Sequence, residues 1–330
     1  MRIRMWLAAL LLLAGCRQAV EIDDARRQEH LQSFDYVWET VRDKHYDPKL
    51  GGVDWDAARA ELRPLVEAAK TDDDARAAMV QLLDRLKLSH YAIAPAGAKP
   101  RHELGNATPP LAQDAPAEMV QFANLPEISL RHHYQRLPEN IGYFYLSIFL
   151  EPGRVMPAYR KAIADARACD GFVLDLRHNP GGIGGMAMGM GNVFVTKPDQ
   201  KLGTMIQRDL ELKFVLTPQA EPHTTPLAIL IDSGSASTAE ILAGGLQDIG
   251  RARVFGTRSA GMALPSVVEK LPNGDTFQYA IANYISTGGQ TLEGRGVEPD
   301  EVVTAEPSGD NDPVLAAAVK WIKSQTEKKQ

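Results

Sequence analysis

Residues 226–261 read PLAILIDSGSASTAEILAGGLQDIGRARVFGTRSAG, and this stretch decides the fold. The apolar run at 227–231 predicts a buried parallel strand, and a helical pattern follows at 240–246. The small residues between them predict a tight turn that leads into a helix N-terminus. Unpaired backbone N–H groups and the positive end of the helix dipole favour developing negative charge there. Ser237, which lies at this point, is therefore a candidate nucleophile.

The same residues also permit a purely structural interpretation. Ser237 and Glu240 have the S-x-x-E spacing of a capping box, in which each side chain accepts a hydrogen bond from the other residue's backbone N–H. Such boxes are common, so this segment taken alone favours a helix cap over a nucleophile. A chemical role requires partners elsewhere in the chain.

The composition narrows the class of protein. The chain has 330 residues, of which 44% are hydrophobic and 24% charged, with a net charge of −6. These values are typical of a soluble globular protein, and scattered basic residues give no stripe that could neutralise phosphates. We expect no nucleic-acid partner, no metal and no cofactor. Cys169 is most simply a small, half-buried core residue.

The N-terminus predicts export. Two arginines precede an apolar run at 5–14, which is too short to span a bilayer as a stable anchor and is typical of a signal peptide. The sequence LAGC that ends at Cys16 resembles the lipobox of bacterial lipoproteins, in which the cysteine is acylated. Residues 1–16 would then be a lipoprotein signal peptide and residues 17–29 a tether to a membrane surface. The alternative is a plain secretory signal with a chance cysteine.

The residue after Cys16 indicates the membrane to which the anchor would be sorted. Arg17, rather than Asp, follows the cysteine. In a Gram-negative cell this resembles the signal for outer-membrane sorting. The expected location is the cell envelope, lipid-anchored and facing the periplasm.

Hydrophobic periodicity divides the rest of the chain into three parts. Residues 30–93 have helical spacing and predict a small N-terminal helical subdomain. Residues 94–139 are rich in Pro, Ala and polar groups and predict a connecting region. Residues 140–330 alternate between strand and helix patterns and predict an α/β core. The elements expected are helices at 55–69, 72–86, 155–167 and 313–326, and strands at 141–149, 171–176, 253–256 and within 276–286.

A second motif follows a predicted parallel strand. The sequence DLRHNPGG at 175–182 places two glycines where backbone amides can approach a substrate without interference from a Cβ atom. The amide of Gly181, together with that of Thr238 after the nucleophile, could form an oxyanion hole. The alternative is a tight strand-to-helix turn with no chemical role.

A base must be found among eight histidines. His132 and His133 lie in a charged segment that predicts an exposed loop, and no second ligand pair at metal spacing accompanies them. His178 lies in the glycine turn and could line a site. His90 follows Ser89 where the helical subdomain ends.

Together these motifs carry a family resemblance. The stretches at 175–182, 234–240 and 256–261 resemble the tail-specific (carboxyl-terminal-processing) serine peptidases and the core of tricorn protease. The sequences GVDW at 52–55 and LSH at 88–90 are similar to the helical part that precedes the tricorn core. The resemblance implies an α/β (α+β) fold: a crotonase-like ββα core domain preceded by a small helical N-terminal subdomain. Many relatives carry a PDZ domain before the core, but the interval 94–139 is too short for one.

The resemblance also implies the catalytic residues. Ser237 occupies the nucleophile position. In the tail-specific branch a lysine base follows the motif G-x-x-x-x-G, but here Met262 follows Gly261, and a thioether cannot accept the proton. The tricorn-like branch uses a serine–histidine pair, which Ser89 and His90 supply.

A distant glutamate orients that histidine in the tricorn-like branch. Glu293 is the best match, with Glu298 as the alternative. The implied function is a serine endopeptidase that hydrolyses peptides or unfolded protein tails in the cell envelope.

Two other functions compete with this one. A non-catalytic lipoprotein could bind hydrophobic molecules or peptides on the same scaffold, with Met186, Met188 and Met190 lining an apolar cleft. Those methionines are explained as well by a flexible loop or by core packing. An acyl-CoA enzyme with a similar oxyanion hole is disfavoured because the chain has no basic nucleotide-binding patch.

Overall fold

The computed structural model describes residues 21–98, 108–121, 127–309 and 311–327. The predicted signal peptide at 1–16, with Cys16, and the first part of the predicted tether therefore lie outside the described residues. Within the described ranges, no helix has both the length and the apolar character needed to cross a membrane.

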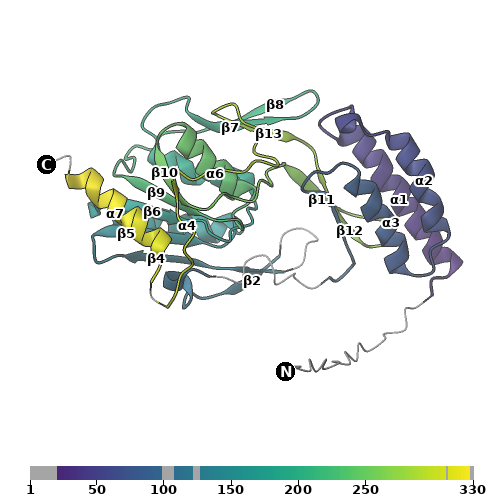
Figure 1. Ribbon diagram of the computed structural model, residues 1–330, viewed down its shortest axis with the longest axis horizontal. Coiled ribbons are helices and arrows are strands. Elements are labelled where there is room, and N and C mark those ends of the chain that lie inside the picture. Colours follow the sequence, from purple (N-terminus) through teal and green to yellow (C-terminus); the bar gives the residue numbers. More distant parts are fainter. Residues whose placement is uncertain (1–20, 99–107, 122–126, 310, 328–330) are drawn as a thin grey trace, which may run out of the picture.

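A helical subdomain forms one end of the molecule (Figure 1). Its helices are α1 (Asp24–Lys44), α2 (Trp55–Glu67) and α3 (Asp72–Asp84), and they bury Phe34, Val37, Leu62 and Met79 between them. The predicted tether at 17–29 extends too far, because α1 begins at Asp24. Asp23 caps this helix by accepting a hydrogen bond from the Arg26 amide. This cap lies before the first apolar residues from which the helical pattern is predicted.

The core is built on a six-stranded sheet in the order β14-β10-β9-β6-β5-β4. All neighbouring strands are parallel except β4 and β5. The central strand β9 is fully buried, as the apolar run predicts. The strands are β4 (His132–Arg136), β5 (Ile141–Leu146), β6 (Gly171–Asp175), β9 (Leu227–Ile231), β10 (Ala252–Gly256) and β14 (Glu301–Val302).

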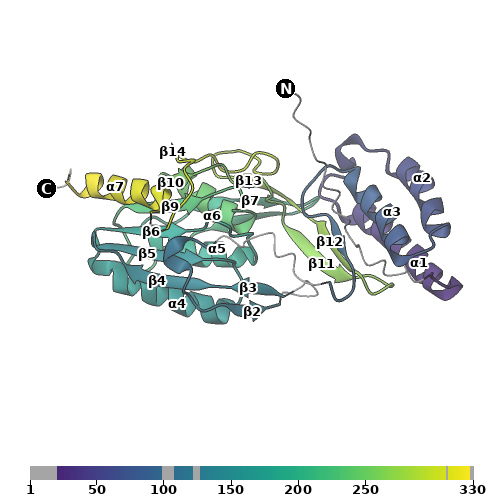
Figure 2. The ribbon, with the colours of Figure 1, turned by 60° about the horizontal axis from the view of Figure 1, so that its bottom comes forward.

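Helices cover both faces of this sheet. Alternate side chains such as Phe144 and Ile229 pack toward α4 (Pro152–Asp165), α5 (Gly184–Gly191) and α6 (Thr238–Asp248). The others, such as Tyr143 and Leu230, pack toward α7 (Pro313–Glu327). Figure 2 shows α4 and α7 on opposite sides of the strands. The predicted α/β (α+β) class with a leading helical subdomain is confirmed.

Smaller sheets surround this core. The sheet β13-β7-β8 consists of β7 (Lys201–Ile206), β8 (Glu211–Val215) and β13 (Asn283–Ser286). The sheet β1-β12-β11 consists of β1 (Ala92–Ala94), β11 (Ser266–Lys270) and β12 (Thr276–Ala280), and it lies between the core and the helices (Figure 2). A hairpin of β2 (Glu118–Val120) and β3 (Ile128–Leu130) completes the described strands.

Two sequence predictions need correction here. His132 and His133 lie in strand β4 and not in an exposed loop, so the core sheet begins inside the predicted connecting region at 94–139. His132 is half-buried and stacks on Phe144, an apolar contact that its charged neighbours conceal in the sequence. The run at 184–191 forms helix α5, in which Met186 and Met190 are buried, and this favours core packing over an apolar cleft.

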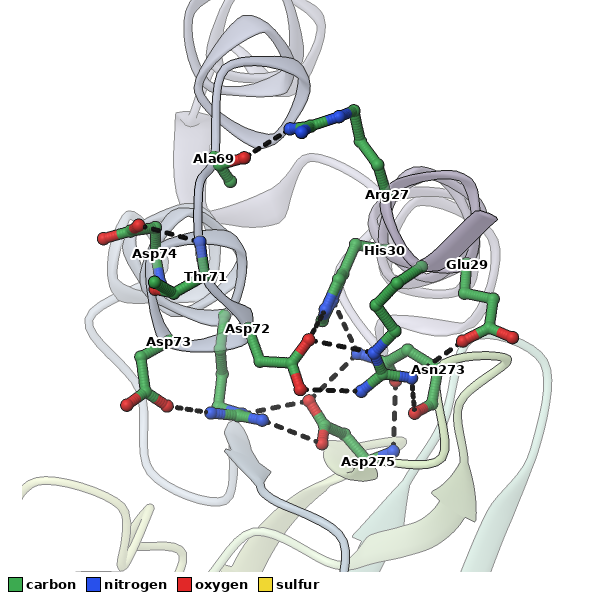
Figure 3. A network of polar contacts seen from close by, with 12 residues as sticks. Arg27, Glu29, His30, Ala69, Thr71, Asp72, Asp73, Asp74, Asn273 and Asp275 are labelled. Carbon is green, nitrogen blue, oxygen red and sulfur yellow. Dashed lines mark hydrogen bonds and ion pairs between the residues drawn. The ribbon is translucent and has the colours of Figure 1, made fainter. Parts of the chain in front are cut away.

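A polar network fixes the helical subdomain to the turn between β11 and β12 (Figure 3). Asp72 accepts hydrogen bonds from Arg26 and contacts the buried His30 at 2.6 Å. The other ring nitrogen of His30, Nδ1, lies 3.0 Å from the side-chain nitrogen Nδ2 of Asn273. Arg76 donates twice to Asp275, at 3.0 and 3.1 Å. Since β12 pairs with β1, which begins shortly after His90, this network also helps to place His90 relative to the core.

Arg76 offers a matched pair of stability variants. It contacts Asp275, whose side chain is 1% exposed, and Asp73, whose side chain is 92% exposed. We expect Asp275→Ala to lower the free energy of unfolding by about 3 kcal/mol, because it removes the buried partner of a largely buried guanidinium. Asp73→Ala should change it little, since exposed ion pairs contribute little. Urea unfolding measures both, and equal losses would contradict the role given to the buried pair.

Candidate active site

Ser237 lies at the start of α6 in a strained conformation. Its φ of 53° and ψ of −116° are unusual for a residue with a side chain. Its backbone N–H donates to the Met262 carbonyl and to Glu240 Oε2, both at 2.8 Å. The turn therefore presents a half-buried hydroxyl at a helix N-terminus, as the sequence predicts. The capping interaction from Glu240 is present as well, so the two interpretations of this motif do not exclude each other.

The glycine turn after β6 packs directly against Ser237. The Ala236 amide donates to the Asn179 carbonyl at 2.8 Å. A Cβ atom on Gly181 would lie 2.6 Å from Ser237 Cβ, so only glycine allows this approach. The Thr238 hydroxyl donates to the Gly182 carbonyl at 2.9 Å. The motifs at 175–182 and 234–240 thus meet at Ser237, the predicted nucleophile.

The predicted oxyanion donor Gly181 needs a revision. Its amide donates to Asn179 Oδ1 at 2.9 Å, so this N–H is already engaged. Asn179 is not among the residues predicted for the site, although an asparagine side chain often bonds to the backbone two residues further on. The amides of Gly182 and Thr238 have no hydrogen-bond partner within the described part of the chain.

Three predicted residues from distant parts of the chain form a hydrogen-bonded relay. Ser89 Oγ lies 2.7 Å from His90 Nδ1 and donates to Glu293 Oε2 at 2.7 Å. The Ser89 amide donates to Glu293 Oε1 at 2.6 Å. Because the hydroxyl proton points to the carboxylate, Ser89 Oγ must accept from Nδ1–H. This assigns the tautomer of His90 that leaves Nε2 unprotonated and able to act as a base.

The alternative glutamate takes no part in this relay. Glu298 is exposed, and its carboxylate lies 3.9 Å from Arg258. Glu293, in contrast, also accepts from the Ala263 amide at 3.1 Å. Glu293 is therefore the glutamate bound to Ser89.

Met262 and Ala263 connect the relay to the nucleophile. Met262 accepts from the Ser237 amide, and the next residue, Ala263, donates to Glu293. No hydrogen bond joins His90 and Ser237 directly within the described residues, and their catalytic pairing stays a prediction. Such bonds are often long before substrate binds. The Met262 side chain is 44% exposed beside Ser237, where it offers no proton acceptor.

The electrostatics suit a neutral imidazole. Burial lowers the pKa of His90 below its ordinary value of 6.5, and the charge of Glu293 opposes this only in part. His178, the other histidine near the turn, contacts Asp232 at 2.8 Å through Nδ1. Several hydrogen bonds, led by that of His178, hold the pKa of Asp232 below its ordinary value despite burial. Asp232 is not among the residues predicted for the site, because 54 positions separate it from His178.

The fold and the site together resemble the centre of a serine peptidase, with a strained serine at a helix N-terminus and a histidine bonded to a serine–glutamate pair. Residues 140–303 match the family model of peptidase family S41, and residues 26–84 match that of the tricorn protease C1 domain. The part of the chain at 140–303, which holds the α/β core and Ser237, thus belongs to the S41 peptidase family.

Named relatives agree with this assignment. A carboxyl-terminal-processing protease of Synechocystis sp. is 29% identical over 184 residues, which are 56% of this chain and 42% of the relative. A carboxy-terminal-processing protease of Bartonella bacilliformis is 31% identical over 180 residues, which are 51% of this chain and 40% of the relative. The chain thus matches less than half the length of these relatives.

Solved structures share the fold. A lipoprotein from Streptococcus agalactiae superposes with a TM-score of 0.64 at 16% identity, covering 89% of this chain and 96% of that one. At this identity the likeness concerns the fold alone.

Proposed function

We propose that this protein is a serine endopeptidase that cleaves peptides or unfolded protein tails, with Ser237 as nucleophile and His90 as base. The observation that carries the proposal is the relay Glu293–Ser89–His90, which is bonded to the same short loop that holds the Ser237 backbone. Membership of the S41 family supports it. Both predicted halves of the site thus meet on one structural element.

The reaction follows from this arrangement. His90 Nε2 takes the proton of Ser237 as Oγ bonds to the substrate carbonyl carbon, and the carbonyl electrons move to oxygen. The intermediate then collapses, the C–N bond breaks, and His90 gives its proton to the leaving amine. Water, deprotonated by the same imidazole, then attacks the acyl carbon, the bond from that carbon to Ser237 Oγ breaks, and His90 returns its proton to Oγ. Ser89 and Glu293 hold the tautomer and stabilise the imidazolium.

The oxyanion is assigned to the amides of Thr238 and Gly182. Thr238 follows Ser237 in the chain, and its hydroxyl donates to the Gly182 carbonyl. The amides of Thr238 and Gly182 have no hydrogen-bond partner among the described residues, whereas the Gly181 amide donates to Asn179. The first N–H groups of a helix are unpaired by geometry and favour negative charge. A donor of this kind typically contributes a factor of about 10²–10³ to the rate.

A fluorophosphonate probe tests this proposal. We expect one covalent adduct on Ser237, found by peptide mapping, and none in Ser237→Ala. The labelling rate should fall as the pH drops through the pKa of His90, because protonation removes the base. Since burial lowers that pKa, reactivity should persist below pH 6.5. A folded protein that stays unlabelled, or equal labelling of Ser237→Ala, would contradict the proposal.

We also propose that acylated Cys16 anchors the protein to a membrane surface in the cell envelope. The support is the signal-like N-terminus with LAGC before Arg17. Cells fed an alkyne-tagged palmitate should label the wild type, and Cys16→Ser should lose both the label and membrane sedimentation. Cys169→Ser is the matched control and should keep both. Membrane sedimentation of an unlabelled Cys16→Ser protein would contradict acylation as the anchor.

A further inference from the structure

Glu240 is buried at the junction of the two halves of the site. Its residue exposure is 0%. Oε1 accepts from the Ser259 hydroxyl at 2.6 Å and the Gly261 amide at 2.7 Å. Oε2 accepts from the Ser237 amide at 2.8 Å and the Met262 amide at 3.0 Å. Each carboxylate oxygen therefore receives two hydrogen bonds.

These bonds exceed the needs of a helix cap. A capping box requires only the bond from Ser237, whereas the other three donors come from the segment 259–262 that follows β10. This segment accepts from the Ser237 amide at Met262 and continues to Ala263, which donates to Glu293. Glu240 thus links the strained nucleophile turn to the segment that contacts the histidine relay.

The donor set favours an ionised carboxylate. Three of the four donors are backbone N–H groups, which cannot accept a hydrogen atom from a protonated carboxyl. The fourth, the Ser259 hydroxyl, already accepts from the Val297 amide at 2.6 Å while it donates to Glu240. A strained residue such as Ser237 persists only when its surroundings hold it in place. Loss of one or two of these bonds would therefore relax the turn that presents the hydroxyl.

No charged side chain bonds to Glu240 within the described part of the chain. The titratable groups on the neighbouring segments are Glu293 and His90 of the relay, and the pair formed by His178 and Asp232 on the turns that precede Ser237. Arg258 is exposed on the loop after β10, and Arg295 is exposed on the loop that carries Glu293. Burial therefore raises the pKa of Glu240 above its ordinary value of 4.5, although all four hydrogen bonds oppose the shift.

We propose that Glu240 is a positioning residue for the nucleophile, and that its ionised carboxylate is required to hold Ser237 and the segment 259–262 in the reactive arrangement. Activity would then be lost when Glu240 takes up a proton, separately from the protonation of His90. This inference rests on the proposed peptidase function.

The pH dependence of fluorophosphonate labelling tests this inference in the full chain, because it needs no knowledge of the substrate. The pKa of His90 is lowered and that of Glu240 is raised, so the two values lie closer together than usual. On the acid side of the pH profile, here called the acid limb, the wild-type labelling rate should therefore fall with the slope expected for the uptake of two protons. Glu240→Gln should react roughly 10²-fold more slowly, as expected for a displaced nucleophile. The acid limb of this variant should have the slope expected for the uptake of one proton only. Glu298→Gln, an exposed glutamate, is the matched control and should behave as wild type.

Ser259→Ala provides a second readout if Glu240→Gln folds poorly by circular dichroism. It leaves the carboxylate with three donors, which should move one step of the acid limb to higher pH while labelling near neutral pH is kept. Glu240→Gln with wild-type rate and a two-proton limb, or Ser259→Ala with an unmoved limb, would overturn the inference and leave the peptidase intact. A folded wild type that the probe does not label would overturn the peptidase and this inference together.

Discussion

His90→Ala is expected to lower kcat on unfolded casein by about 10⁶-fold, as large a loss as Ser237→Ala, because nucleophile and base act as one unit. Ser89 donates to Glu293 and so fixes the proton of His90 on Nδ1, which leaves Nε2 as the acceptor. Burial lowers the pKa of His90, so the imidazole is neutral near pH 7. Met262, which stands where a lysine base would follow the glycine motif, offers only a thioether and cannot replace the imidazole.

Two other histidines control this experiment. His133 lies on strand β4 and bonds to Gln135, so His133→Ala should retain activity. His178→Ala asks whether the histidine bonded to Asp232 could serve as base instead. Retained activity in His90→Ala together with a loss in His178→Ala would assign the base to His178 and refute the relay. Circular dichroism and unfolding midpoints establish that each variant is folded.

The turn that carries Ser237 could be predicted from the sequence because its signals are local. The apolar run at 227–231, the small residues after it and the S-x-x-E spacing of Ser237 and Glu240 describe a strand, a turn and a helix start within a short stretch. Each signal depends on a few residues that are close in the sequence, so it does not depend on the tertiary structure. The strand–turn–helix geometry accordingly agrees with the structure.

The histidine relay could not be derived in this way. Ser89 and Glu293 are 204 positions apart, and no periodicity or spacing connects them. Their association came from a family resemblance, and the structure shows the bond that joins them. Local reasoning likewise missed the three donors that reach Glu240 from 259–262, because a tertiary approach of two loops has no signature in either loop.

The Gly181 amide shows a different limit. Gly181 has a φ of 96° and lies close to Ser237, and a glycine at this position of the motif predicts both features. The direction of its N–H, however, depends on the Asn179 side chain, whose amide also donates to the Leu146 carbonyl. Which of two adjacent glycines presents a free amide is therefore decided by a rotamer in the turn and by the strand beside it.

Glu293→Gln is expected to lower kcat by about 10⁴-fold, comparable with the loss on replacing the carboxylate of other serine-peptidase triads. Glu293 Oε2 accepts from both the Ser89 hydroxyl and the Ala263 amide, while Oε1 accepts from the Ser89 amide. An amide nitrogen at the Oε2 position would donate to Ser89 Oγ. The hydroxyl proton would then turn toward His90 Nδ1 and favour the tautomer with the proton on Nε2, which cannot act as a base.

A double mutant separates this explanation from simple loss of a contact. If Glu293 acts through Ser89, the variant Ser89→Ala with Glu293→Gln should lose little more activity than Glu293→Gln alone, because both changes break one relay. Glu298→Gln, which alters an exposed carboxylate on the same segment, should retain full kcat. Multiplicative losses in the double mutant would mean that Glu293 and Ser89 act independently. His90 would then owe its orientation to the backbone around it, where its φ of 62° already restricts the ring.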